Sequence, residues 1–217
     1  MRIEQLDYEL PQELIAQYPV TPRDASRLLV VERETGRISH HIFRELPQFL
    51  NAGDCLVINQ TRVMPYRLLG SKVGGGARIE LLLQEQLDKT NWIALAYRSR
   101  RLRPGIRIHF GADLECEVLE NLGDGRFVFQ FHFQGDFLNL LERYGEVPLP
   151  PYVERPGGLE SSDRERYQTV YAETPGSSAA PTAGLHFTPE LMGRITSQQV
   201  DFARITLDVG QDTFQPV

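Results

Sequence analysis

The middle of the chain constrains the fold most, because residues 62–133 carry six strand-like segments and almost no helical pattern. Apolar and polar residues alternate over 114–118. Four phenylalanines recur at every second position over 127–133, as expected for strands with one buried face. Glycine and aspartate occupy the turns between the segments. Strands at this spacing predict a small β-barrel or a curled sheet.

The segments on either side of this region mix helical and strand-like patterns. Thr188 followed by Pro189 gives the last predicted helix a capping residue and a proline at its first position. We therefore predict an α/β fold: an α/β domain formed by residues 1–60 and 148–217, with a small β-barrel domain of residues 61–147 inserted into it. The predicted helices span 11–17, 43–50, 135–145 and 188–199, and the predicted flanking strands span 27–33, 37–43, 53–61 and 200–209.

Composition and charge narrow the class of protein. The start of the chain is too polar for a signal peptide and no apolar run reaches membrane length, so we expect a cytoplasmic protein. Cys55 and Cys116 lie in apolar patterns without metal-ligand spacing, which predicts two buried free thiols and no metal site. The net charge of -6 argues against nucleic-acid binding over the whole surface, yet residues 61–79 and 91–111 contain only basic charged residues.

A first candidate site lies at residues 59–65, at the end of a predicted strand. Asn59, Thr61 and Arg62 supply two neutral hydrogen-bonding groups and one planar cation. Such a set suits a ribose hydroxyl, a carboxylate or a phosphate. A polar connection between two strands explains the same residues equally well.

Residues 97–105 form a second candidate, because arginines stand there beside an aromatic residue. Phosphate contacts and base stacking require this combination. A solvated, arginine-rich hairpin has the same composition, so both interpretations stay open. The arginines that we single out are Arg98, Arg100, Arg101 and Arg103.

Two tyrosines form a third candidate. Tyr167 and Tyr171 lie four residues apart, so a helix would place both on one face. Packing is the usual reason for such a pair, but a tyrosine ring also stacks on a nucleobase. We retain both as substrate-binding candidates.

The fourth candidate is the stretch 177–188, in which small residues surround a single histidine. Ala183 and Gly184 would let a backbone approach a ligand closely. The predicted helix after His186 would offer free N–H groups to an anion. His186 would then be a proton carrier or a hydrogen-bond donor, unless it is a structural histidine. The sequence thus predicts a small-molecule or nucleic-acid site between the two domains.

Taken in order, these stretches resemble one family, the S-adenosylmethionine:tRNA ribosyltransferase-isomerases of queuosine synthesis. The resemblance covers essentially the whole chain, and "AAPTAGLHFT" is its most specific part. The other stretches that carry it are "DYELPQELIAQYP", "PRDASRLLVV", "INQTRVMPYRLLG", "VPLPPYVER" and "DRERYQTVYA". The family fold is similarly an α/β domain with an inserted β-barrel and an active site between them.

The resemblance implies an unusual reaction. S-adenosylmethionine would donate its ribosyl group to 7-aminomethyl-7-deazaguanine at the tRNA wobble position, and rearrangement would give epoxyqueuosine. S-adenosylmethionine is then a substrate, and we expect no cofactor. The sulfonium acidifies the C5′ protons, so a modest base suffices, and the departing adenine needs a proton donor. The family members are monomers, and both substrates are cytoplasmic.

The resemblance also suggests roles for the candidates. His186 would handle a proton or hold an anion, with Thr182 and Thr188 as nearby hydrogen-bond donors. Asn59 and Arg62 would hold the ribosyl or methionine end. The arginines of 98–107 would contact phosphates of the anticodon stem. The remaining substrate-binding candidates are Thr61, Tyr167, Tyr171, Ala183 and Gly184.

The sequence departs from the family pattern in two respects. Family members continue beyond the counterpart of Val217, so we expect C-terminal elements of the α/β domain to be missing here. Five positions also differ from the family pattern, and three of them, Asp208, Asp212 and Gln215, lower the positive charge beside any bound anion. An active short member, a non-catalytic relative that retains tRNA or S-adenosylmethionine binding, and a truncated product are all compatible with this pattern. The substituted positions are Gln60, Asp208, Gln211, Asp212 and Gln215.

Overall fold

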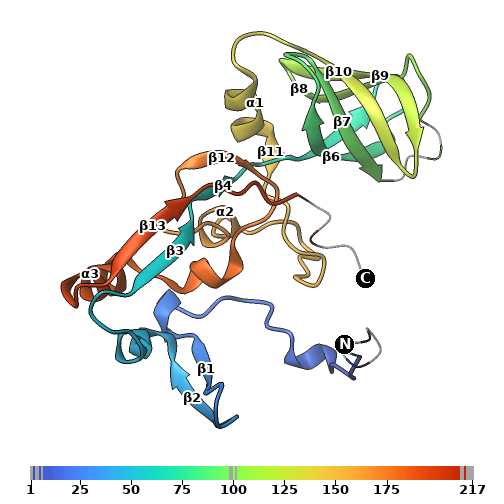
Figure 1. The fold of residues 1–217 in the computed structure, drawn as a ribbon. Helices are drawn as coiled ribbons and strands as arrows, with labels where there is room; N and C mark the ends of the chain where they lie inside the picture. The colour runs from blue at the N-terminus through green and yellow to red at the C-terminus, as the bar shows by residue number, and fades with distance from the viewer. Residues whose placement is uncertain are drawn as a thin grey trace.

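The six strands predicted between residues 62 and 133 form a closed barrel (Figure 1). The structure is a computed structural model that describes residues 7–97 and 102–210, together with Arg2, Gln5, Arg100 and Thr213. The strand order β5-β6-β7-β10-β9-β8 closes through a further pairing of β5 with β8. The strands are β5 (Arg67–Lys72), β6 (Arg78–Gln86), β7 (Asn91–Tyr97), β8 (Arg107–Gly111), β9 (Leu114–Gly123) and β10 (Arg126–Phe133).

Alternate side chains fill the barrel, as the sequence pattern predicts. Phe129 is fully buried on β10 and Cys116 on β9, and burial raises the pKa of the Cys116 thiol well above its ordinary value. The helix α1 (Phe137–Tyr144) covers one end of the barrel, where the ring of Phe137 lies 5.6 Å from that of Trp92. The predicted helix at 135–145 is thus confirmed. Its N-cap is Asp136, which accepts a hydrogen bond from the Asn139 N–H, and it ends at Gly145.

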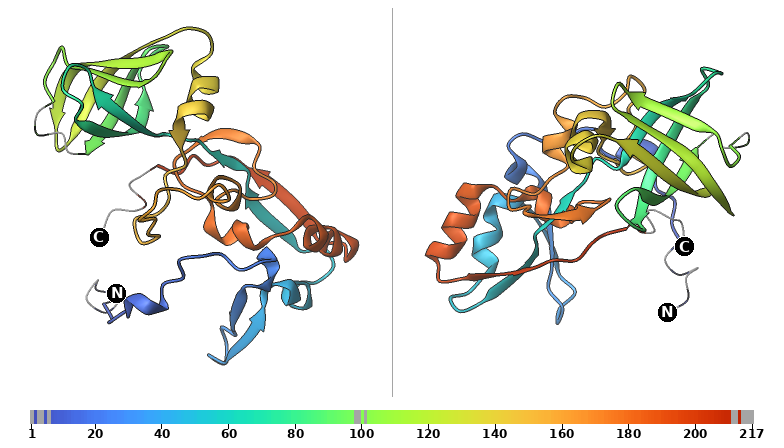
Figure 2. Two further views of the ribbon diagram at one scale, coloured as in Figure 1. Left: turned by 180° about the vertical axis from the view of Figure 1, so that it is seen from behind. Right: turned by 90° about the horizontal axis from the view of Figure 1, so that it is seen from above.

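The remainder of the chain, here called the body, is built from strands paired two by two. β3 (Cys55–Asn59) runs parallel to β13 (Asp201–Ile205), and β4 (Thr61–Val63) runs parallel to β12 (Thr174–Ser177). β1 (Arg27–Val31) and β2 (Ile38–Ile42) form the predicted hairpin. The chain enters the barrel after β4 and leaves it after the short strand β11 (Gly145–Glu146). The views in Figure 2 show the barrel and the body side by side, with α1 between them.

The helix α3 (Pro189–Ser197) starts as predicted. The Thr188 hydroxyl accepts a hydrogen bond from the Leu191 N–H at 3.1 Å, and Pro189 occupies the first helical position. Leu191 and Ile195 pack the helix against Phe43 and Phe187 in the core of the body. Among the described residues, none of the helices is long and apolar enough to span a membrane.

Several expectations about the body were wrong. The predicted helices at 11–17 and 43–50 are 3₁₀ helices, Gln12–Leu14 and Phe43–Phe49, and the second contains Pro47, which lacks the N–H that a regular helix needs. The last predicted strand stops at Ile205.

The strand β3 also differs from the prediction, because it is not a buried strand. Only Ile58 is buried along it, Val57 is 64% exposed, and the Cys55 thiol is exposed. Within the part of the chain that the structure describes, β3 pairs with β13 alone, and the exposure of Cys55 and Val57, which share one face, shows that this face has no layer over it. The predicted burial of Cys55 is therefore wrong, and that of Cys116 is confirmed.

Candidate functional site

A pocket of about 540 Å³ lies where the chain crosses from the body into the barrel, and we call it the motif pocket. Three separate segments of the body line it, at Arg23, at residues 62–65 and at residues 161–172, and α1 adds Glu142. Arg23 falls within "PRDASRLLVV", residues 62–65 within "INQTRVMPYRLLG", and the third segment, apart from Ser161, within "DRERYQTVYA". Three sequence motifs that are far apart in the chain thus converge on one cavity.

Gln168 fixes the wall of the motif pocket that β4 provides. Its side-chain amide donates to the Val63 carbonyl at 2.6 Å and accepts from the Val63 N–H at 3.1 Å. One side chain thereby replaces a missing strand neighbour, because it satisfies both backbone groups of Val63. Next to it, the Thr169 hydroxyl is buried and has no hydrogen-bond partner among the residues described.

Arg23 joins the motif pocket to the histidine-containing stretch. Its guanidinium donates to the backbone carbonyls of Gln168 at 2.6 Å, Glu165 at 2.8 Å and Leu185 at 3.3 Å. Burial, followed by the nearby charge of Arg166, lowers the pKa of Arg23, but an arginine remains charged at neutral pH. Because Leu185 directly precedes His186, this arginine brings the fourth motif to the edge of the pocket.

His186 is half-buried beside Arg23. It lies in the 3₁₀ helix Thr182–His186, and its ring centroid is 5.3 Å from that of Phe43. Burial lowers the pKa of His186 below its ordinary value, and the charge of Arg23 acts in the same direction. The imidazole is therefore neutral at pH 7 and able to accept a proton. The side chain adjoins the motif pocket without lining it.

The other residues of this stretch have different surroundings from those that the sequence predicted. Thr182 and Ala183 are exposed, and the Thr188 hydroxyl is engaged as the cap of α3. Gly184 is buried, and a Cβ atom there would collide with the hydroxyl group of Tyr171. The space beside this glycine is therefore filled by a tyrosine of the protein itself, whereas the sequence suggested room for a ligand.

The two tyrosines do not share a helix face, so that prediction was wrong. The helix α2 (Asp163–Arg166) ends before Tyr167. Tyr167 packs in one apolar cluster with Val63, whereas Tyr171 packs in another, where its ring centroid lies 6.2 Å from that of Phe187. Both are 7% exposed, and burial raises the pKa of Tyr167 to about 12.

Asn59 and Thr61 lie apart from Arg62, because successive side chains of a strand point to opposite faces. The Asn59 side chain donates to the Leu207 carbonyl at 2.9 Å and ties β3 to the segment after β13. The Thr61 hydroxyl is fully buried, 2.7 Å from that of Ser177. Asp208 lies 3.4 Å from the Thr61 hydroxyl, so this carboxylate faces hydroxyl groups.

Gln60, at another of the substituted positions, makes contacts in the same region as Thr61 and Asp208. The Gln60 amide donates to the hydroxyl groups of Thr174 and Thr206 at 3.4 and 3.2 Å. A neutral amide thus bridges β12 and the end of β13. Gln211, Asp212 and Gln215 lie outside the described residues.

Arg62 is exposed and reaches the motif pocket, where it meets a second arginine. Arg62 Nη2 lies 3.4 Å from Glu142 Oε1, and Arg164 Nη1 lies 3.1 Å from Glu142 Oε2. The two guanidinium groups come from the body, and the carboxylate comes from α1 at the base of the barrel. One carboxylate is therefore held by two cations at the mouth of the pocket.

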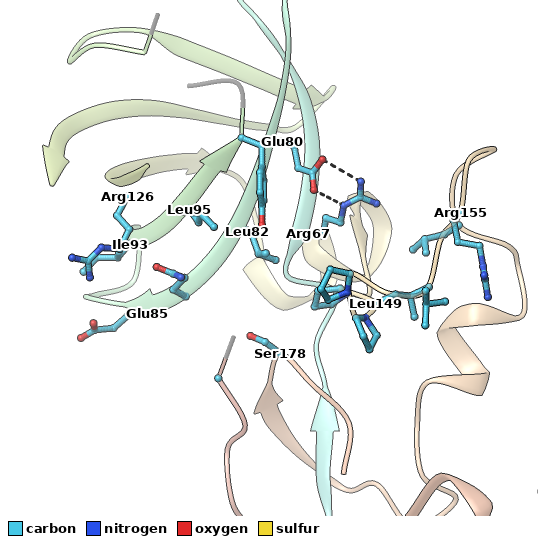
Figure 3. A pocket seen from close by; sticks show the side chains of 18 of the residues that line it. Arg67, Glu80, Leu82, Glu85, Ile93, Leu95, Arg126, Leu149, Arg155 and Ser178 are labelled. Atoms are coloured by element: carbon cyan, nitrogen blue, oxygen red, sulfur yellow. Dashed lines mark hydrogen bonds and ion pairs between the residues drawn. The ribbon is translucent and has the colours of Figure 1, made fainter. Parts of the chain in front are cut away.

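A larger cleft of about 910 Å³ lies between the outer face of the barrel and the proline-rich segment 148–151 (Figure 3). Leu82, Leu95 and Tyr97 form its barrel wall. Arg67 lies in this cleft but is neutralised, since it contacts Glu80 and Glu146 at 2.7 Å each. Of the site residues predicted from sequence that the structure describes, none lines the cleft.

The two cavities differ in the chemistry that they offer. The walls of the larger cleft combine leucine, isoleucine and proline side chains with charged groups; its Arg67 and Arg155 are paired with carboxylates, and Arg126 is a third arginine there. The motif pocket is smaller but holds three guanidinium groups, a buried hydroxyl and the neutral His186 beside it. We regard the motif pocket as the candidate active site because Arg62, a residue predicted from the sequence, lines it and His186 lies beside it, although it is not the larger cavity.

The arginine-rich stretch lies between β7 and β8. Arg100 and Arg103 are exposed, and Tyr97, which precedes the stretch, lines the larger cleft. Arg98 and Arg101 lie outside the described residues. No group of histidine, cysteine, aspartate and glutamate suited to a metal ion occurs in the described part of the chain.

Sequence reasoning missed several residues of the motif pocket. All except Glu142 lie within the quoted motifs, so the motifs contained the signal, but their side chains could be assigned to one cavity only once the fold was known. Glu142 lies in the helix 137–144 and has no local signal of its own. The missed residues are Arg23, Glu142, Arg164, Gln168 and Thr169.

The geometry defines a cavity that holds three guanidinium groups, with a neutral histidine beside it, and comparison with known proteins assigns the family of the chain. Residues 3–217 match the sequence profile of the queuosine biosynthesis proteins. The chain belongs to this family. It is 53% identical to the S-adenosylmethionine:tRNA ribosyltransferase-isomerase of Symbiobacterium thermophilum and 50% identical to that of Desulfitobacterium hafniense, each over 100% of this chain and 63% of the relative.

A solved structure matches as well. The S-adenosylmethionine tRNA ribosyltransferase of Thermotoga maritima is 36% identical, with a TM-score of 0.38, over 94% of this chain and 58% of that one. The chain thus spans 63% of the length of the two curated relatives named above.

Proposed function

We propose that this chain takes part in the ribosyltransferase-isomerase reaction of its family. S-adenosylmethionine would donate its ribosyl group to 7-aminomethyl-7-deazaguanine in tRNA, and the product would be epoxyqueuosine. The observation that carries the proposal is the convergence of three family motifs on the motif pocket, with the fourth held at its edge by Arg23. The names of the curated relatives support the same reaction.

The neutral state of His186 suits the first chemical step. The sulfonium of S-adenosylmethionine acidifies the C5′ hydrogens, so the base only needs to be unprotonated and close. A histidine kept neutral by burial and by a neighbouring arginine meets the first requirement. The imidazolium that forms could then return its proton to the departing adenine, with Thr182 and Thr188 as nearby hydrogen-bonding groups.

The remaining groups would bind and orient the substrates. Arg62 reaches the pocket and would hold the methionine end, whereas Asn59 and Thr61 would keep β3 and β4 in place through the contacts that they already make. None of Tyr167, Tyr171, Ala183 and Gly184 lines the motif pocket, so the proposal gives them a structural role, with the two tyrosines in the apolar clusters of the body. S-adenosylmethionine is consumed as a substrate, and no cofactor enters the proposal.

The barrel would bind the tRNA. Arg100 and Arg103 are exposed between β7 and β8, and exposed arginines can contact phosphates on either side of a target base. We also place the reaction in the cytoplasm, with the chain acting as a monomer.

Adenine release tests the proposal directly. The protein is incubated with S-adenosylmethionine and an anticodon stem-loop that carries the aminomethyl-deazaguanine base, and free adenine is quantified. Release that depends on the modified stem-loop would support catalysis by these 217 residues. If a monodisperse, cooperatively folding sample released no adenine but still bound either substrate, a non-catalytic relative would be the better description.

A further inference from the structure

Glu142 bridges two arginines that come from a different part of the molecule. Arg62 lies on β4 and Arg164 on α2, whereas Glu142 lies on α1, and the two contacts measure 3.4 and 3.1 Å. Each of its carboxylate oxygens faces one guanidinium. This is the arrangement in which arginines hold a free carboxylate or a phosphate.

Stability does not explain the bridge. The side chains of Arg62, Arg164 and Glu142 are 49%, 46% and 38% exposed, and ion pairs at this exposure typically contribute about 0–1 kcal/mol to stability. Arg164 already anchors α1 by other means, because its Nη2 donates to the backbone carbonyls of Glu142 and Gly145 at 2.9 and 3.0 Å. The Glu142 carboxylate could therefore leave the two guanidinium groups while the backbone contacts of Arg164 still hold α1.

We propose that Arg62 and Arg164 form the binding site for the carboxylate of S-adenosylmethionine, and that Glu142 occupies this site until the substrate displaces it. The proposal rests on the proposed function and names the substrate group that the two arginines recognise. Glu142 is then a built-in competitor of the substrate, and its removal strengthens substrate binding.

The pocket has the size and charge for this exchange. Its volume of about 540 Å³ accommodates the amino-acid part of the substrate, and Thr169 lines the same cavity. The guanidinium groups of Arg23, Arg62 and Arg164 face two carboxylates, Glu142 and Glu165. A substrate carboxylate that replaces Glu142 leaves the charge around the arginines unchanged, so the exchange buries no uncompensated cation.

Calorimetry with two ligands tests the proposal. S-adenosylmethionine and its decarboxylated form differ by the carboxylate alone, and the proposal expects the intact form to bind about tenfold more tightly, as two charge-assisted contacts would give. Glu142→Gln removes the competing charge but keeps the shape, and it should strengthen binding of the intact form by about threefold. Binding of the decarboxylated form should stay unchanged.

The arginine variants should change the affinity for S-adenosylmethionine in the opposite direction to Glu142→Gln. Arg62→Gln and Arg164→Gln should each weaken binding of the intact form by about tenfold and leave the decarboxylated form unaffected, which also shows that the variants fold. Arg204→Gln serves as the matched control, because Arg204 is 49% exposed and pairs with Glu173 at 3.2 Å away from the pocket.

The outcomes separate this inference from the proposed function. Equal affinities for both ligands, or a weaker complex in Glu142→Gln, overturn the inference while adenine release continues to support the function. A clear preference for the intact ligand without adenine release supports the inference and counts against catalysis. Failure of both ligands to bind overturns the two together.

Discussion

The barrel and the body differ in how their strands pair and in how deeply their apolar side chains are buried. In the barrel, every strand pairs with its neighbours around a closed ring, and Phe129, Leu81 and Val118 are completely buried. In the body, strands pair two by two, and Val57 and Leu29 are 64% and 55% exposed. The barrel therefore holds most of the stable core, whereas the body supplies the groups suited to chemistry. Variants in the barrel and variants in the body both test this division.

The largest expected effect is on the stability of the barrel. Phe129→Ala removes a fully buried ring and should lower the free energy of unfolding by about 3–5 kcal/mol. Val57→Ala in the body should change it by less than about 0.5 kcal/mol, because that side chain is mostly exposed. Urea unfolding measures both. Comparable losses for the two variants would show that the body has a core as closed as that of the barrel.

The next largest effect is expected on turnover, from a change at His186 in the body. His186→Ala should lower the rate of adenine release by about 100-fold or more, since it removes the proposed proton acceptor, while the unfolding midpoint stays close to that of the wild type. His109→Ala, an exposed histidine on the barrel strand β8, is the matched control and should retain full activity.

The pH profile sharpens the same prediction. Because burial lowers the pKa of His186, the neutral form persists below pH 6.5, the ordinary histidine pKa. Adenine release should therefore fall only below that pH as the imidazole becomes protonated. An acid limb centred above pH 6.5 would contradict the role of His186 as the base.

A smaller effect is expected at Gly184. Its replacement by alanine places a Cβ against the Tyr171 hydroxyl and should lower the free energy of unfolding by about 1–3 kcal/mol. Tyr171→Phe removes that hydroxyl and should recover part of the loss in the double variant. In contrast, Gly193→Ala meets open space within α3 and should stabilise the protein by about 0.5–1 kcal/mol. An unchanged stability of Gly184→Ala would mean that the stretch 182–186 moves away from Tyr171.

The same difference between the regions explains which features the sequence predicts. Barrel strands pair mostly with the next strand along the chain, so alternation and turns over 114–133 suffice to recognise them. The start of α3 is equally local, because Thr188 and Pro189 specify it. β3, in contrast, pairs with β13 far along the chain, and no local pattern shows that one of its faces lacks a covering layer.

The candidate site shows the same limit. His186 and Arg62 were recognised from their own neighbours in the sequence, but Glu142 and Arg164 acquire a role only where α1 meets α2. Tyr167 and Tyr171 would share a helix face only if α2 continued beyond Arg166, where it ends; both are buried, as packing residues are. A residue whose function depends on a contact between segments distant in sequence leaves no periodic signal.

The smallest expected effect tests the barrel as the region that binds RNA. If Arg100 and Arg103 each contact one phosphate, then Arg100→Ala and Arg103→Ala should each reduce the slope of log K against log salt by about 1, as measured by anisotropy of a labelled stem-loop. Arg194→Ala, on the helix α3 of the body, should leave the slope unchanged. Neither barrel variant should alter the affinity for S-adenosylmethionine, because that ligand is assigned to the motif pocket. The opposite outcome would be weaker S-adenosylmethionine binding in the barrel variants with an unchanged salt slope. The barrel would then bind S-adenosylmethionine and not the RNA, and the larger cleft beside Tyr97 would become the better candidate for the nucleoside.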